Sequence, residues 1–290
     1  MKHWKLAVIA ALWSGALYAA PMPVVVSFSI LGDVAQQIGG ERVAVQSLVG
    51  ANQDAHAYNL TSSDIKKIRE ARLVLLNGLG LEKAELQRAV KQSKVASAEA
   101  TAGIKPLAAD EHHHEHGHDH DHDHGEFDPH VWNDPVLMQR YAANVAIALI
   151  KADPAGSRYY QQRFKDYQNV LNQLNNYANQ QFGAVAPAKR KVLTGHDSFA
   201  YLGKRYQVKF ISPQGVSSEA EPSARQITAI IRQIKAENVK AVFTENIKDG
   251  RMIARIAKET GVKVSGGLYA DALSSGAPAG TYADMFRYNV

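Results

Sequence analysis

The 290-residue chain contains no cysteine. This absence excludes a disulfide framework, and it also excludes zinc sites built from thiolates, so nitrogen and oxygen atoms are left as metal ligands. It also removes the N-terminal cysteine to which a bacterial lipoprotein attaches its lipid. We therefore expect an exported chain without a lipid anchor.

Long hydrophobic runs are scarce as well, and the clearest one lies at the N-terminus. The stretch M-K-H-W-K-L-A-V-I-A-A-L-W-S-G-A-L-Y-A-A combines a short basic start, an apolar run and small residues near Ala19 and Ala20. This pattern is typical of a secretory signal peptide, and the run is too short for a stable membrane span. We predict that residues 1–20 are cleaved near Ala19/Ala20 and that the protein resides in the periplasm. The alternative is an uncleaved anchor helix.

Between Lys105 and Arg140 the chain has neither lysine nor arginine, although it carries a net charge of +5 overall. The positive charge elsewhere is dispersed and no nucleic-acid motif accompanies it, so we predict no nucleic-acid partner. The basic-free stretch instead contains an acidic, histidine-rich tract without apolar residues, which predicts a loop over residues 110–126. Alternating His and Asp favour many weak, exchangeable zinc sites, and the alternative is an acidic loop without function. The histidines of this low-affinity metal loop are His112, His113, His114, His116, His118, His120, His122 and His124.

Strand and helix patterns alternate along the rest of the chain, which predicts an α/β fold of two lobes, each a parallel sheet with flanking helices. The last strand is predicted at 262–264. Apolar positions spaced three and four apart from Tyr160 to Phe182 predict a long rigid helix that joins the lobes. We predict a first lobe over 21–152, the linking helix over 153–183 and a second lobe over 184–290.

Outside the signal segment and the tract, only three histidines remain, and each lies beside a predicted strand end or helix start. His56 and His130 belong to the first lobe and His196 to the second. In open α/β sheets, ligands gather beyond the carboxyl ends of strands, so a shared metal would lie between the lobes. Asp271, after the last predicted strand, is the best fourth ligand for tetrahedral zinc, and its alternative role is a helix or turn cap. Glu245 and Asp197 are weaker candidates, for which we favour roles in orienting the imidazoles.

Four segments together resemble the cluster A-I family of periplasmic metal-binding proteins of ABC importers, and are most similar to zinc members of the ZnuA and AztC type. They are D-x-H-x-Y around His56, D-P-H-V-W around His130, G-H-D-S-F-x-Y around His196 and T-Y-x-D-M near the end. The resemblance implies two α/β lobes joined by a long helix, with His56, His130, His196 and Asp271 as ligands of one metal. It also implies a preference for zinc, because manganese members tend to have a carboxylate in place of His196, and manganese favours oxygen ligands.

The sequence therefore predicts a binding protein, not an enzyme, that captures one zinc ion tightly and delivers it to an ABC transporter permease in the inner membrane. We expect a monomer, and a periplasmic zinc metallochaperone as a further partner. One alternative is a zinc-dependent hydrolase, although no H-E-x-x-H motif occurs. The other alternative is a periplasmic zinc buffer or adhesin in which the histidine tract does the work. Since ligand imidazoles must be neutral, we expect binding to weaken below about pH 6.5.

Overall fold

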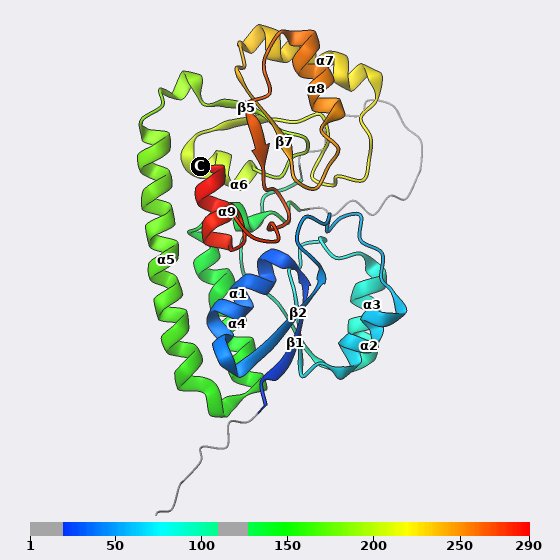
Figure 1. Ribbon diagram of the computed structural model, residues 1–290, viewed down its shortest axis with the longest axis vertical. Coiled ribbons are helices and arrows are strands. Elements are labelled where there is room, and N and C mark those ends of the chain that lie inside the picture. Colours follow the sequence, from blue (N-terminus) through cyan, green and yellow to red (C-terminus); the bar gives the residue numbers. More distant parts are fainter. Residues whose placement is uncertain (1–19, 110–126) are drawn as a thin grey trace, which may run out of the picture.

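The computed structural model describes residues 20–109 and 127–290. Residues 1–19 of the predicted signal peptide and the histidine-rich tract lie outside the described residues. Two four-stranded parallel sheets form the centres of two lobes, with strand orders β2-β1-β3-β4 and β6-β5-β7-β8. Figure 1 shows one lobe below the other, with the long helix α5 running beside both. The predicted fold class is confirmed.

The central strands of the first sheet, β1 and β3, are buried on both faces. The strands of this sheet are β1 (Met22–Phe28), β2 (Val43–Val49), β3 (Leu73–Leu76) and β4 (Ala96–Glu99). Val24 and Val26 face a core that includes residues of α1 and α4, whereas Val25 and Val74 face the helices α2 and α3. Near-continuous apolar strands are expected where helices cover both faces of a parallel sheet. These four helices are α1 (Ser29–Gly39), α2 (Ser62–Glu70), α3 (Ala84–Ser93) and α4 (Leu137–Ala152).

The second lobe is built from shorter strands. They are β5 (Lys191–Leu193), β6 (Lys209–Ile211), β7 (Ala241–Glu245) and β8 (Gly266–Leu268). Leu193, Ile211 and Val242 pack with buried residues of two helices in a separate small core. The prediction of a strand at 262–264 is wrong, because β8, the strand that pairs with β7, begins at Gly266, two residues beyond the end of the predicted strand. The helices of this half are α6 (Ala200–Tyr206), α7 (Ala224–Glu237), α8 (Arg251–Thr260) and α9 (Tyr282–Asn289).

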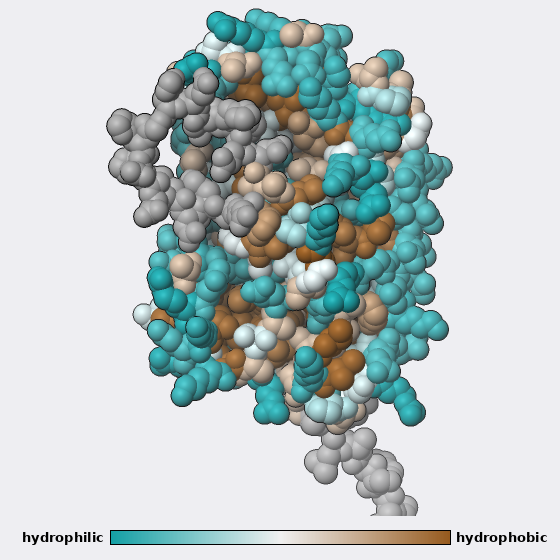
Figure 2. Space-filling view, turned by 180° about the vertical axis from the view of Figure 1, so that it is seen from behind, coloured by the Kyte–Doolittle hydropathy of each residue, from teal (hydrophilic) through white to brown (hydrophobic). Residues whose placement is uncertain are grey.

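The linking helix α5 spans Ser157–Gly183, or about 40 Å at 1.5 Å per residue. Tyr160, Leu171 and Leu174 on its predicted apolar face are fully buried, and the core that they join contains residues from both lobes. The outward side of α5 forms the hydrophilic right-hand margin of the rear view in Figure 2. Helix α9 lies against α5 and α1, so the end of the chain returns toward the first lobe. The domain boundaries at 152 and 183 stay predictions.

None of the described helices is both long enough and apolar enough to cross a membrane.

Candidate metal centre

Three of the four predicted ligands lie in loops at the carboxyl ends of strands, and the fourth, His130, lies in the long connection between β4 and α4. His56 lies in the loop between β2 and α2, and that helix begins with a capping box formed by Thr61 and Asp64. His130 immediately precedes a short 3-10 helix at Val131–Asn133. His196 follows β5, and Asp271 follows β8. Each lobe thus contributes two side chains to the space between the lobes, where ligands collect in open α/β sheets.

The structure brings these four side chains together. One ligand atom from each of His56, His130, His196 and Asp271 lies within 4.8 Å of the others. The carboxylate of Asp271 lies at the centre: its oxygens are 3.5 Å from His56 Nε2, 3.4 Å from His130 Nε2 and 3.1 Å from His196 Nε2. His56 is 7% exposed, and the other three are fully buried. Three imidazole nitrogens and one carboxylate therefore converge from both lobes on one buried point.

The electrostatics of this cluster suit a cation. Burial alone would raise the pKa of Asp271, but His196 and His130 hold it well below its ordinary value. Burial lowers the pKa of His56 to about 4, so this imidazole is neutral and free to donate its lone pair. Both carboxylate oxygens of Asp271 and the Nε2 atom of His196 are buried without a well-oriented hydrogen bond. Buried polar atoms normally find a partner, and a metal ion would supply one here.

Two of the imidazoles are held through their other ring nitrogen by a carboxylate. Glu245, at the end of β7, lies 2.6 Å from His196 Nδ1 through its Oε2 atom, and its Oε1 accepts the backbone N–H groups of Gly195 and His196. Asp128 lies 2.7 Å from His130 Nδ1 and also accepts the backbone N–H of His130. A carboxylate in this position fixes the tautomer, so that Nε2 presents its lone pair to a metal. The geometry of Glu245 thus suits the orienting role that the sequence suggested.

Sequence reasoning missed Asp128, and it also missed Asp54, whose Oδ1 accepts the backbone N–H of His56. The signal was available, because both residues belong to an Asp-x-His triplet. In each triplet the carboxylate accepts the N–H of the histidine two residues later, which shapes the loop around the ligand.

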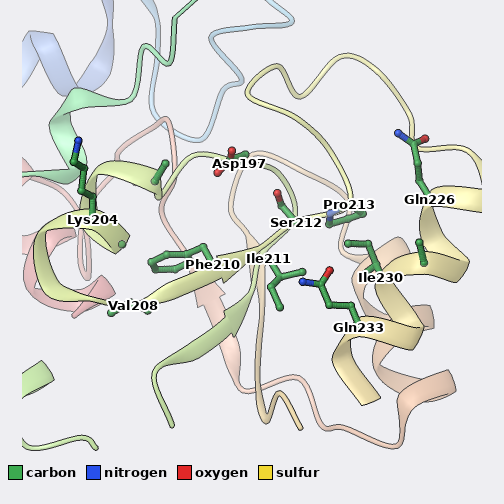
Figure 3. A pocket seen from close by; sticks show the side chains of 13 residues that line it. Asp197, Lys204, Val208, Phe210, Ile211, Ser212, Pro213, Gln226, Ile230 and Gln233 are labelled. Carbon is green, nitrogen blue, oxygen red and sulfur yellow. The ribbon is translucent and has the colours of Figure 1, made fainter. Parts of the chain in front are cut away.

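Asp197 follows His196 directly in the chain. It lines a separate cavity of about 460 Å³ between α6, β6 and α7. Figure 3 shows Asp197 near Ser212 on one side of this cavity, with Ile230 and Gln233 of α7 on the other. Its role in orienting an imidazole stays a prediction. The eight tract histidines lie outside the described residues.

Comparisons with known proteins also find metal-binding proteins. The model of the family described as zinc-uptake complex component A, periplasmic (ZnuA) matches residues 24–290. The manganese-binding lipoprotein MntA of Bacillus subtilis is 32% identical over 279 residues, which cover 93% of this chain and 87% of that protein. The iron-binding protein YfeA of Yersinia pestis is 29% identical over 273 residues, covering 94% and 85%. The structure of the periplasmic zinc binding protein TroA from Treponema pallidum superposes with a TM-score of 0.84 at 26% identity, covering 93% of this chain and 96% of that one.

Proposed function

Because this chain belongs to the ZnuA family, we propose that it captures zinc between its two lobes and delivers it to the permease of an ABC transporter. The convergence of His56, His130, His196 and Asp271 on one buried point carries this proposal. Delivery requires a binding protein to hold its cargo without converting it. A ligand set filled by four protein groups suits this task, since a catalytic zinc site keeps one position open for water or substrate. The hydrolase alternative is therefore less favoured.

The choice of zinc rests on the ligand set, since relatives with this fold are named for manganese, iron or zinc. Three imidazoles and one carboxylate give an N3O shell. Manganese favours oxygen-rich sites, whereas imidazole suits zinc. Copper would bind the same atoms at least as tightly, so the metal available in the compartment also determines what is bound. We place the protein in the periplasm, as the family description states for its members.

Further parts of the proposal concern partners. A binding component of an ABC importer needs a membrane permease, and we propose that the protein meets it as a monomer. A periplasmic metallochaperone and additional weak zinc sites at the histidines between His112 and His124 belong to the same proposal. A zinc buffer or adhesin would depend on that tract instead of on the site between the lobes.

Metal analysis of the purified protein tests the proposal. We expect one tightly held zinc ion per wild-type chain after dialysis, and its loss in His196→Ala and Asp271→Ala. Removing a ligand should weaken binding by more than about 100-fold, since even residues that only orient ligands contribute 10–100-fold. Glu259→Gln is a suitable control, because this carboxylate lies in α8, is exposed, and pairs with Arg255. Full zinc content in both ligand variants, or manganese in place of zinc when both are supplied, would contradict the proposal.

A further inference from the structure

The loop that carries His56 is fastened to the opposite lobe. At its start, the backbone N–H of Asn52 donates to the carbonyl of Leu273 at 2.8 Å, and the Asn52 side chain accepts a hydrogen bond from Asn246 at 3.0 Å. Two residues later, the hydroxyl of Ser218 donates to Asp54 Oδ2 at 2.6 Å. All three partners belong to the second lobe. The position of His56 therefore depends on contacts that cross between the lobes.

Asp54 connects the two sides with its two oxygens. Its Oδ1 accepts the N–H of His56 at 2.9 Å, while its Oδ2 accepts from Ser218 and lies 3.6 Å from the Lys248 ammonium. The Asp54 side chain is 10% exposed and that of Lys248 is 27% exposed, whereas Ser218 is fully buried. Asp54 contacts no metal-facing atom of the site, so it acts by positioning His56.

Ser218 is in turn held in place by its own lobe. Its carbonyl accepts hydrogen bonds from Gln214 Nε2, at 3.2 Å, and from Lys248 Nζ. Gln214 pairs with His196 in a short parallel bridge. The connection therefore runs without a break from one ligand, His56, through Asp54 and Ser218 to the segment of another ligand, His196.

Around Trp132, the hydrogen bonds between the lobes are accompanied by apolar packing. There, the Trp132 indole donates to the Ala270 carbonyl and Asn133 donates to the Ser198 carbonyl, both at 2.8 Å. Trp132 is fully buried and belongs to the core that both lobes share with α5. Separating the lobes there would expose apolar surface, whereas separating them at Asp54 breaks polar contacts at a partly exposed edge. The Asp54 side is therefore the side that costs less to open.

We propose that Asp54, Ser218 and Lys248 form a clasp that sets how fast the bound metal leaves the site. The inference rests on the proposed function, because it takes zinc as the bound ion. A closed clasp keeps His56 against the metal. When the clasp opens, His56 withdraws with its loop, and the three remaining ligands hold the metal less tightly. The clasp thus governs the dissociation rate more than the association rate.

The test is the rate at which zinc-loaded protein loses its metal to an excess of chelator, followed by stopped flow. Ser218→Ala removes a hydrogen bond to a charged group, and we expect dissociation to become about tenfold faster. Lys248→Met removes a partly exposed charge, and we expect an increase of about threefold. The association rate of both variants should stay within about twofold of wild type. The melting temperature of the metal-free protein should fall by no more than about 5 °C. A Ser218→Ala protein that fails to fold leaves Lys248→Met to decide.

Glu219→Gln is the matched control. Glu219 lies next to Ser218 and its carboxylate also crosses between the lobes, at 2.7 Å from the Lys83 ammonium, but its side chain is 46% exposed. We expect this variant to release zinc at the wild-type rate. Wild-type rates in Ser218→Ala and Lys248→Met, or an equal increase in all three variants, would overturn the clasp. A wild-type protein that retains no zinc after dialysis would overturn the proposed function instead.

Discussion

The two lobes hold their histidines in different ways. In the first lobe, Asp128 orients His130 from only two positions away in the chain, through a local Asp-x-His turn. In the second lobe, Glu245 orients His196 from 49 positions away, at the end of the neighbouring strand β7. The first arrangement depends on one loop. The second depends on the order of the strands in the sheet, so the geometry of His196 is a property of the whole lobe.

The first lobe is also more extensively packed with apolar side chains than the second. The first sheet is covered on both faces, and its helices α1 and α4 are extensively buried. In the second lobe, α7 has Ile234 as its one fully buried residue, and the small core beneath α7 and α8 is separate from the main one. We therefore expect the hydrogen bonds of Glu245 to matter more for the position of His196 than apolar packing does.

The strongest test of this difference exchanges each orienting carboxylate for its amide. Glu245 uses Oε1 for two backbone N–H groups and Oε2 for His196 Nδ1. In Glu245→Gln, the amide NH2 must replace one of these acceptors, and we expect zinc affinity to fall about 100-fold. Asp128 serves both of its partners through Oδ1 alone. Asp128→Asn keeps that oxygen, and we expect a loss of no more than about tenfold.

Competition titration against a zinc chelator measures both affinities, and Glu259→Gln again serves as the exposed control. Equal losses in the two amide variants would show that the local and the long-range arrangement are equivalent. A larger loss in Asp128→Asn would reverse the comparison.

The sequence was a good guide to the fold where residue types were distinctive. The apolar positions spaced three and four apart from Tyr160 to Phe182 predicted the long helix α5, and the apolar run of β1 is equally typical of a buried strand. The last strand was misplaced because Val262 and Val264 resemble a strand, whereas Gly266 and Gly267 in β8 offer no side chains that favour one. Ala96–Glu99 was missed for the same reason, since Ala and Glu are uncommon in strands. In both cases pairing with a neighbouring strand outweighed local preference.

The candidate site could be predicted because the folded body contains only three histidines, which leave few choices for the ligand set. The contacts of Asp54 could not be predicted. Its partners, Ser218 and Lys248, lie on loops after β6 and β7, and only the placement of one lobe against the other brings them to the His56 loop. Polar residues in loops carry no pattern that identifies such a partner in advance.

The pH dependence of zinc binding gives a second test of the two lobes. In the metal-free protein, burial alone would lower the pKa of His196, but Glu245 and Asp271 raise it well above its ordinary value. His56, with a pKa lowered to about 4, is already neutral. Zinc must therefore displace a proton from His196, and we expect affinity to fall about tenfold for each pH unit below the raised pKa of His196.

The weakening should therefore begin above the value of about 6.5 expected for an ordinary imidazole. As the pH falls through about 4, His56 is protonated too and the dependence becomes steeper. Calorimetry in buffers of different ionisation enthalpy should show release of about one proton per zinc at pH 7. Glu245→Gln should release fewer, because it removes a charge that raises the pKa of His196. Zinc binding without proton release would contradict the role of His196.

The smallest effect is expected from deleting residues 112–124. The tight site uses His56, His130, His196 and Asp271, and none of these lies in the deleted segment. Calorimetric titration of the deleted protein should therefore show one strong site with an affinity within about twofold of wild type, while the weaker additional binding disappears. Disappearance of the strong site would move the function from the space between the lobes to the tract, and would favour the zinc buffer or adhesin. Retention of the weak binding would show that other side chains, not the tract histidines, take up the extra zinc.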